Sequence, residues 1–237
     1  MDIGVIILEH HYRGFTEEAI QSALAQTLRP KCVLLSTGDL YRVYTRFQGL
    51  RVQRLQTESE GERLLAATRE CQGVDAYALL EDDDVWLPNH LERAAKYLAQ
   101  GRVLYQSATQ PPVFPIGANA STVAFTSDLD LAKVASYPTL IDTVLVLSAI
   151  EQGFAYVFDP SPTTVRRIHT QNISIYRKWW LRERDRLLSR LLSDFPEGPA
   201  RKLAEMYVVK DYGSGEPLRR AAALVRWGLR QLVRPSS

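Results

Sequence analysis

Short apolar segments alternate with helical patterns along the N-terminal part of this chain. The segments that we predict to be strands are Ile3–Leu8, Val33–Leu35, Val52–Leu55, Ala76–Leu80 and Val103–Tyr105. Continuous apolar runs of this length are typical of parallel strands buried on both faces, because helices cover both sides of a parallel sheet. The pattern therefore predicts an α/β fold with a mostly parallel sheet flanked by helices.

Helix start signals follow three of these strands. Thr16 is predicted to cap the first helix, with acidic residues in the first turn, where the helix dipole favours negative charge. Ser59 and Glu62 form a capping box that opens a second helix. Asn89 and Glu92 open a third in the same way. The resulting order, β-α-β-β-α-β-α-β, is typical of a parallel sheet with crossover helices.

After Ser107 the pattern loosens through three prolines and then resumes as one strand, one helix and one strand. These are predicted at Thr122–Phe125, Asp142–Gln152 and Ala155–Phe158. Beyond His169 only helical patterns follow, at Trp179–Leu192, Ala200–Val208 and Leu218–Val233. We therefore expect an α/β domain over residues 1–175 and a helical C-terminal extension over 176–237.

The composition is that of a globular protein. Of its 237 residues, 46% are hydrophobic and 24% are charged, which excludes a disordered chain, a collagen or a coiled coil. No apolar run approaches the roughly 20 residues that a transmembrane helix needs, and the N-terminus lacks the features of a signal peptide. A cytoplasmic location is expected. Cys32 and Cys71, which are 39 positions apart and have no CxxC partner, are predicted to be small core residues without a disulfide or thiolate metal site.

Charge is unevenly distributed although the net charge is only +2. Residues 161–237 hold 16 Lys and Arg against 7 Asp and Glu, whereas residues 1–160 hold 13 against 20. An acidic part suits a divalent cation, and a basic tail suits phosphates of a nucleic acid or an anionic membrane.

Four consecutive acidic residues, Glu81 to Asp84, follow the predicted strand Ala76–Leu80. Ligands bind at this end of the strands in open α/β sheets, and clustered carboxylates require a cation such as Mg²⁺ or Mn²⁺. Alternation along an extended chain would direct Glu81 and Asp83 to one side, and Asp82 and Asp84 to the other. The alternative is a solvated loop whose acids cap the next helix.

Four segments in order resemble motifs of the inverting, family-two type of glycosyltransferase with the GT-A fold. Glu81–Pro88 resembles D-D-D-D-x-W-L-P, and Ser22–Thr27 is similar to S-V-L-A-Q-T. Asp142 with Leu145 is similar to E-D-x-x-L, and Arg167–Ser174 to R-x-H-x-x-N-x-S. The resemblance covers about residues 3 to 175. It implies a GT-A-like fold, a nucleotide-sugar donor, Mn²⁺ or Mg²⁺, and a glycan or lipid-linked acceptor.

The resemblance also implies roles for individual residues. Asp142 matches the catalytic base, which takes the proton of the acceptor hydroxyl. Asp83 matches a metal ligand, and Glu81 and Asp82 match positions at the metal or the donor ribose. His169 resembles a position at the metal or diphosphate, and the alternative is a loop histidine bonded to the backbone. The positions expected at the donor are Glu9, His10, Thr37, Asp39, Arg63, Glu81 and Asp82. Residues 1–107 would bind the nucleotide-sugar, and residues 108–175 the acceptor.

The chain departs from the family pattern at several of these positions. The loops beginning at Glu9 and Ser36 differ from P-T-Y-N and D-D-G-S, which leaves the donor base open. Ile141 replaces the acid before Asp142, so one carboxylate near the base is missing. Arg63 matches a donor-binding arginine only with a gap, and a solvated helix face is the alternative. These departures motivate a second hypothesis, a GT-A domain that has lost donor binding and acts as a binding or scaffolding module.

The basic tail contains a predicted amphipathic helix, Leu218–Val233, with arginines on one side and apolar residues on the other. Such a helix would suit peripheral association with the inner face of a membrane, and the alternative is packing on its own domain. Nucleic acid is not favoured, because aromatic residues are not interleaved with the basic ones as stacking platforms would require.

Overall fold

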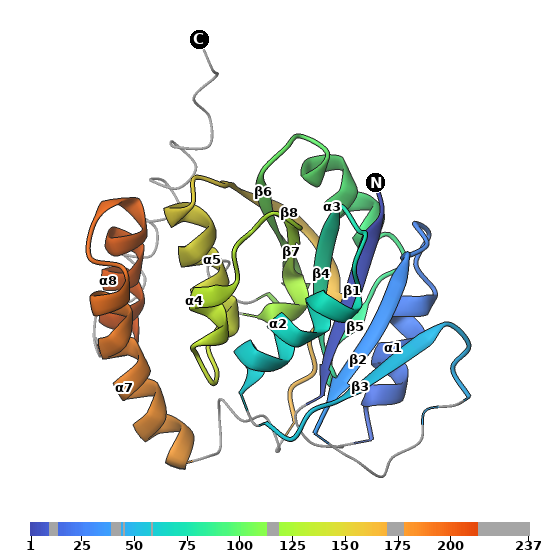
Figure 1. The fold of residues 1–237 in the computed structure, drawn as a ribbon, viewed down its shortest axis with the longest axis horizontal. Helices are drawn as coiled ribbons and strands as arrows, with labels where there is room; N and C mark the ends of the chain where they lie inside the picture. Colours follow the sequence, from blue (N-terminus) through green and yellow to red (C-terminus); the bar gives the residue numbers. More distant parts are fainter. Residues whose placement is uncertain are drawn as a thin grey trace. The chain divides into compact units, whose positions relative to one another are not determined.

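The structure is a computed structural model that describes residues 1–9, 14–38, 44, 46–57, 59–112, 119–169 and 178–212. The chain divides into two compact units, Met1–Arg177 and Lys178–Ser237. Figure 1 shows the course of the chain through both.

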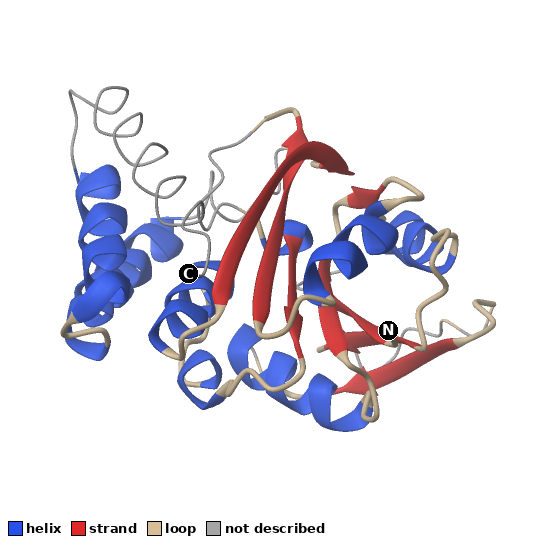
Figure 2. Ribbon diagram, turned by 90° about the horizontal axis from the view of Figure 1, so that it is seen from above, coloured by secondary structure: helices blue, strands red, loops and turns tan. Residues whose placement is uncertain are grey.

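The first unit is built on one eight-stranded sheet, shown in Figure 2. Its strands are β1 (Ile3–Glu9), β2 (Cys32–Thr37), β3 (Leu50–Arg54), β4 (Ala76–Glu81), β5 (Val85–Trp86), β6 (Val103–Gln110), β7 (Val123–Thr126) and β8 (Ala155–Val165). Their order in the sheet is β3-β2-β1-β4-β7-β6-β8-β5. Strand β7 runs antiparallel to β4 and β6, and β5 runs antiparallel to β8, while the other pairs are parallel. The predicted mostly parallel sheet is confirmed.

The central strands β1, β2 and β4 are buried along almost their whole length. Their register pairs Glu9 with Thr37 and Leu8 with Glu81. Because the three strands are parallel, their carboxyl ends reach the same edge of the sheet. Glu9, Thr37 and Glu81 therefore lie along one edge, where open α/β sheets bind ligands.

Helices cover both faces of this sheet. They are α1 (Thr16–Leu24), α2 (Glu60–Glu70), α3 (His90–Leu98), α4 (Ala132–Ala135) and α5 (Ile141–Glu151). Helices α1 and α3 share one apolar cluster with Ile3, Val5 and Ile7 of β1. Alternation along the strand directs Ile6 and Leu8 to the opposite face, and α2 packs on β1 and β2. Helix α4 contacts α2, and the two lie side by side in Figure 1.

The helix caps differ in how well they were predicted. Ser59 is the N-cap of α2 and accepts a hydrogen bond from the Glu62 backbone N–H, as expected. Asn89 holds the N-cap position of α3, but its side chain makes no capping bond. Thr16 as a cap is wrong, because Phe15 is the N-cap residue of α1. The Thr16 hydroxyl is buried and donates to the Glu9 carboxylate instead, 2.8 Å away.

Strand β8 is longer than the sequence predicted. It was expected to end near Phe158 but continues to Val165 through two prolines. Its pairing with β6 shifts register on either side of Ala108, and a proline is tolerated at such an irregularity because no ladder hydrogen bond is lost. The extension leads the chain past Asp159 toward Arg167 and His169.

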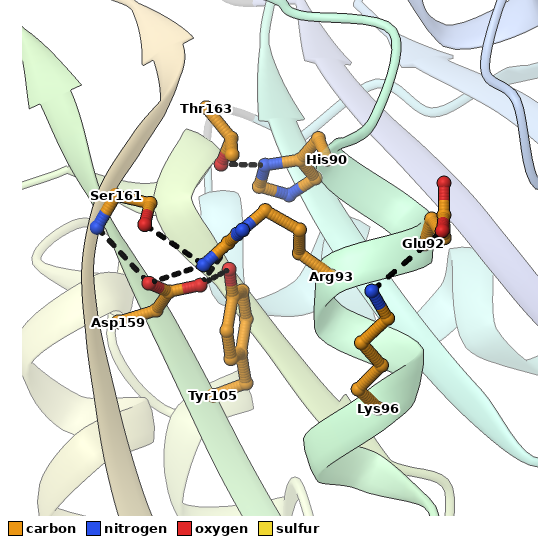
Figure 3. A network of polar contacts seen from close by, with 8 residues as sticks. All are labelled: His90, Glu92, Arg93, Lys96, Tyr105, Asp159, Ser161 and Thr163. Atoms are coloured by element: carbon orange, nitrogen blue, oxygen red, sulfur yellow. Dashed lines mark hydrogen bonds and ion pairs between the residues drawn. The ribbon is translucent and has the colours of Figure 1, made fainter.

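An ion pair between the buried Asp159 carboxylate and the partly exposed Arg93 guanidinium, shown in Figure 3, joins β8 to α3. Asp159 accepts two hydrogen bonds from the Arg93 guanidinium, at 2.8 and 2.9 Å. It also accepts from the Tyr105 hydroxyl at 3.2 Å and from the Ser161 backbone N–H at 3.0 Å. We call these four residues the Asp159 network. Its carboxylate is 1% exposed and is matched by a cation and by neutral donors.

His90 lies beside this network and is part of the core (Figure 3). Its ring is stacked on Trp86 with the centroids 4.2 Å apart. Nδ1 of His90 is 2.8 Å from the Thr163 hydroxyl oxygen. Burial lowers the pKa of His90 to about 3, so the imidazole is neutral and holds α3 against β8.

The two cysteines correct a prediction. Both are buried, as expected, but the structure pairs Cys32 with Cys71 in a disulfide whose Cα atoms are 6.0 Å apart. Cys32 begins β2 and Cys71 is the C-cap of α2, so the packing of α2 on the sheet brings them together. Gly4 leaves room for this contact, because a Cβ there would lie 2.8 Å from the Cys71 sulfur.

The second unit contains helices α7 (Lys178–Asp194) and α8 (Gly198–Tyr212), which pack on each other. Both were predicted, and both are longer than their apolar patterns suggested. The predicted helix Leu218–Val233 lies outside the described residues. Within the part of the chain that is described, no helix is long and apolar enough to cross a membrane.

Candidate functional site

Three acidic residues meet at the carboxyl end of β4. One carboxylate oxygen each from Glu81, Asp83 and Asp84 lies within 4.8 Å of the others, and we call these residues the acidic cluster. The predicted alternation is wrong for Asp84, because the chain turns after β4 and the Asp84 N–H donates to the Glu81 carbonyl. This turn brings Asp84 to Glu81 and Asp83. Asp82, at 0% exposure, is not part of the cluster.

Segments distant in sequence support the acidic cluster. The Asp84 carboxylate accepts from the Asn119 side chain at 2.7 Å and from the Arg167 backbone N–H at 3.0 Å. Nε2 of His169 is 3.0 Å from an Asp83 carboxylate oxygen. The predicted residue His169 therefore does reach the cluster, and there it contacts Asp83 directly.

His169 and Arg167 are held against the start of α1. The His169 ring packs on Phe15 with the centroids 5.0 Å apart. The Arg167 guanidinium lies 4.8 Å from the centre of the Phe15 ring and pairs with Glu18. The segment after β8 is thereby fixed next to the acidic cluster.

The carboxylates of the acidic cluster disfavour one another's charged form. Burial raises the pKa of Glu81 well above its usual value, and the charges of Asp83, Asp84, Asp142 and Glu60 raise it further. Burial and the charge of Asp83 also raise the pKa of Asp84, although hydrogen-bond donors oppose the rise. A bound cation would remove this penalty. Three carboxylates within reach of one ion are the hard oxygen ligands that Mg²⁺ and Mn²⁺ prefer, so the residues present fit such an ion.

Asp142, the predicted base, lies in the first turn of α5. One of its carboxylate oxygens accepts from the Thr143 backbone N–H at 2.7 Å. Its negative charge raises the pKa of both Glu81 and Glu60. The structure thus brings Asp142 within electrostatic range of the acidic cluster, although 58 positions separate it from Asp84 in the sequence.

Sequence reasoning missed Glu60, the first residue of α2. Burial raises the pKa of Glu60 to about 7; Arg63 and a hydrogen bond from Thr139 oppose the rise, and Asp142 adds to it. The family pattern suggested that a carboxylate near the base was missing, and Glu60 supplies one from another part of the chain. The only available signal was its place in the capping-box segment, which predicted a helix start and nothing more.

The positions expected at the donor are partly described. Glu9 is 1% exposed, and its carboxylate accepts from the hydroxyls of Thr16, Thr37 and Tyr44 at 2.8, 2.5 and 2.5 Å. Thr37 is thus bound to Glu9 at the end of the neighbouring strand. The predicted residues His10 and Asp39 lie outside the described residues.

Arg63 does not lie on a solvated helix face, which was the alternative to its expected place at the donor. It is 2% exposed, and its guanidinium donates to the Glu9 backbone carbonyl. The positive charge of Arg63 is therefore buried beside the carboxyl end of β1.

Comparisons with solved structures identify proteins with the same fold. The S. aureus TarS 1-349 structure in complex with UDP-GlcNAc aligns over 81% of this chain and 67% of that chain, with a TM-score of 0.63 and 12% identity. The mannosyltransferase PcManGT from Pyrobaculum calidifontis, in complex with GDP-Man and Mn²⁺, aligns over 98% of this chain and 80% of that chain, with a TM-score of 0.64 and 14% identity. This chain spans 40% of a longer TarS structure.

No family model and no curated protein matches the sequence. At 12 to 14% identity, the likeness to these structures establishes the fold alone. The sheet and its flanking helices agree with that likeness, and the predicted GT-A-like fold is confirmed.

Proposed function

We propose that the chain is a glycosyltransferase that moves a sugar from a nucleoside-diphosphate-sugar to a hydroxyl of a glycan or lipid-linked acceptor. The observation that carries this proposal is the acidic cluster at the carboxyl edge of a GT-A-like sheet, with Asp142 in electrostatic range. A metal-binding group and a separate carboxylate base are the two parts that such a transfer needs.

In the proposed reaction Asp142 accepts the proton of the acceptor hydroxyl as that oxygen attacks the anomeric carbon. The attack and the departure of the diphosphate form one in-line displacement, which inverts the anomeric configuration. Asp83, Glu81 and Asp84 would hold Mn²⁺ or Mg²⁺, with His169 orienting Asp83 through their 3.0 Å contact. When bound, the ion supplies positive charge that stabilises the departing diphosphate.

Donor binding is proposed for residues 1–107 and acceptor binding for 108–175. Arg63, Thr37 and Asp82 lie in the first of these parts, with Glu9, His10 and Asp39. The positive charge of Arg63, beside the carboxyl end of β1, supports an electrostatic role toward the donor phosphates. The carboxylate of Glu9 is surrounded by protein hydroxyls, which supports a role in shaping the pocket for the nucleotide's base.

One observation favours the second hypothesis, a GT-A domain without donor binding. The hydroxyls of Thr16, Thr37 and Tyr44 donate to the Glu9 carboxylate. These hydrogen bonds occupy the carboxylate positions that could otherwise accept hydrogen bonds from a nucleotide. In that case the acidic edge would serve a binding or scaffolding role.

A thermal-shift panel separates the two hypotheses. UDP, GDP, UDP-GlcNAc and GDP-Man are each added with Mn²⁺ and with EDTA, because a ligand that binds only the folded state raises stability by RT ln(1 + [L]/Kd). The glycosyltransferase proposal expects at least one nucleotide to raise Tm in Mn²⁺ and not in EDTA. If no nucleotide or nucleotide-sugar shifts Tm, the module hypothesis is favoured.

Membrane association through Leu218–Val233 remains a proposal based on sequence. Each basic residue near an anionic bilayer contributes about 1 kcal/mol, so the arginines of this segment would give a salt-sensitive attachment. Cutting the chain after Glu216 should abolish sedimentation with anionic liposomes and leave donor turnover unchanged. If neither the full-length chain nor the truncated chain sediments with anionic liposomes at low salt, the proposal fails.

A further inference from the structure

The first turn of α2 is interlocked with the segment that precedes α5. The backbone N–H of Glu60 donates to the Pro138 carbonyl at 2.9 Å, and that of Gly61 to the Tyr137 carbonyl at 3.3 Å. A Cβ on Gly61 would lie 2.2 Å from the Val134 carbonyl oxygen, so only glycine permits this approach. The orphan N–H groups of a helix start are thus used to fix a distant loop.

That loop leads directly to Asp142. Leu140 follows the anchored residues and has a φ of 63°, in the left-handed region. A bulky residue holds this conformation only where its surroundings determine it. The contacts of α2 with Tyr137 and Pro138 supply that constraint, and α5 begins at the next residue, with Asp142 in its first turn.

The Glu60 side chain completes the interlock. Its Oε1 accepts a hydrogen bond from the Thr139 hydroxyl at 3.0 Å. Thr139 lies immediately before Leu140, so the Glu60 carboxyl holds the last anchored residue of the loop. The effect of the Asp142 charge on the pKa of Glu60 shows that the two carboxyls are close enough to interact.

We propose that Glu60 is a positioning residue for Asp142, acting through its hydrogen bond with Thr139. This rests on the proposed function, in which Asp142 is the base. Glu60 does not take the proton of the acceptor; it fixes the loop that sets the direction of the Asp142 carboxylate. A reaction that depends on a well-placed base is sensitive to displacements of about 1 Å.

The test compares kcat and KM of Glu60→Ala, Thr139→Val and Thr139→Ser with those of the full-length wild type, using Mn²⁺ and a nucleotide-sugar that shifts its Tm. Glu60→Ala and Thr139→Val each remove the hydrogen bond, from opposite ends. We expect both to lower kcat by about 10- to 100-fold, with the KM for the donor changed less than about twofold. Thr139→Ser keeps the hydroxyl and should restore kcat.

Glu62→Ala is the matched control. Glu62 lies in the same helical turn and also accepts from a threonine hydroxyl, Thr57, at 2.6 Å, but on an exposed face. It should lose a similar amount of helix stability and keep the wild-type kcat. If Glu60→Ala does not fold, Thr139→Val alone tests the hydrogen bond.

A double-mutant cycle with Asp142→Asn decides whether Glu60 acts through the base. Residues that act as a unit are not additive, so Glu60→Ala should not lower the residual single-turnover rate of Asp142→Asn further. Equal losses in both backgrounds, or wild-type kcat in Thr139→Val, would overturn the inference while the proposed function stands. If the wild type turns over no donor at all, the proposed function itself fails, and this inference fails with it.

Discussion

The acidic cluster and the Asp159 network both bury carboxylates on the same sheet, but they differ in the groups that surround these carboxylates. Asp159 is surrounded by a bidentate guanidinium, a hydroxyl and a backbone N–H. Glu81 and Asp84 face further carboxylates. A carboxylate that is matched within the protein serves stability, whereas carboxylates that raise one another's pKa are typical of sites that bind a cation or take part in catalysis.

The two regions therefore respond to pH with opposite signs. Burial would raise the pKa of Asp159, but the hydrogen bonds from Arg93 and Ser161 outweigh it and the pKa is lowered. Asp159 therefore stabilises the fold at pH values above its pKa in the unfolded chain. This stabilisation is lost as the pH falls through its lowered pKa in the folded protein. For Glu81, Asp84 and Glu60 the pKa is raised, so their effect on stability is most favourable at low pH and is lost as the pH rises.

The largest expected effect is on turnover, at the acidic edge. Asp142→Asn should lower kcat by at least about 10²-fold, as is typical of losing a general base. Donor affinity and Tm should change little, because the proposed role exists only in the transition state. Steady-state kinetics and calorimetry check this, with Asp159→Asn as the control that should keep its kcat. Loss of donor binding with normal turnover of bound donor would contradict the role of Asp142.

The next effect is on stability, at the Asp159 network. Asp159→Asn leaves the Arg93 guanidinium without its counter-ion, and breaking a buried pair costs about 3–5 kcal/mol. Arg93 is 30% exposed, so solvent screening lowers our expectation to about 2–3 kcal/mol. Thermal or urea unfolding measures this loss. An unchanged free energy of unfolding would mean that the network is not the structural counterpart of the acidic cluster.

A smaller effect is expected on ligand affinity at the acidic cluster. Asp83→Asn removes one negative charge from the proposed cation site. Loss of a supporting partner alone weakens metal binding by about 10- to 100-fold, so the Mn²⁺-dependent affinity for nucleoside diphosphates should fall by at least about tenfold. Calorimetry in Mn²⁺ and in EDTA measures this. Equal affinity of the wild type under both conditions would remove the cation from the proposal.

The smallest effect is on the pH dependence of stability. In EDTA, Tm should fall by a few degrees as the pH rises from about 5 to 7.5, because Glu60 has a pKa raised from 4.5 to about 7, and Glu81 and Asp84 are raised as well. Mn²⁺ should reduce the fall, and Glu81→Gln should flatten it. A Tm in EDTA that rises with pH over this range would show that the acidic edge carries no uncompensated charge.

Several features of this protein could be predicted from the residues alone because their physics is local. Ser59 caps α2 as predicted, since a capping bond joins residues three positions apart. The strands β1, β2 and β4 could be predicted from apolar runs, because a strand that is buried on both faces consists almost entirely of apolar residues. The acidic run could also be placed at a ligand-binding edge, because the end of a parallel strand determines that location.

Other features depended on contacts between different helices and strands. Thr16 was expected to cap α1, but the buried Glu9 carboxylate takes its hydroxyl. A solvated helix face was the alternative for Arg63, but the side chain is buried against the C-terminal end of β1. Cys32 and Cys71 were expected to be unpaired, but the packing of α2 on the sheet joins them. In each case the residue's partner lies on another element of the fold.

The difference between what the sequence determines and what the fold determines is clearest for the carboxylates. The acidic run predicted that Glu81 and Asp83 lie together at the end of a strand, and the resemblance to a family motif proposed Asp142 for the same site. That Asp84 and Glu60 join them, while Asp159 does not, was decided by the fold. The charge state of a carboxylate depends on burial and on neighbours within a few ångströms, and only the folded chain determines which distant groups become those neighbours.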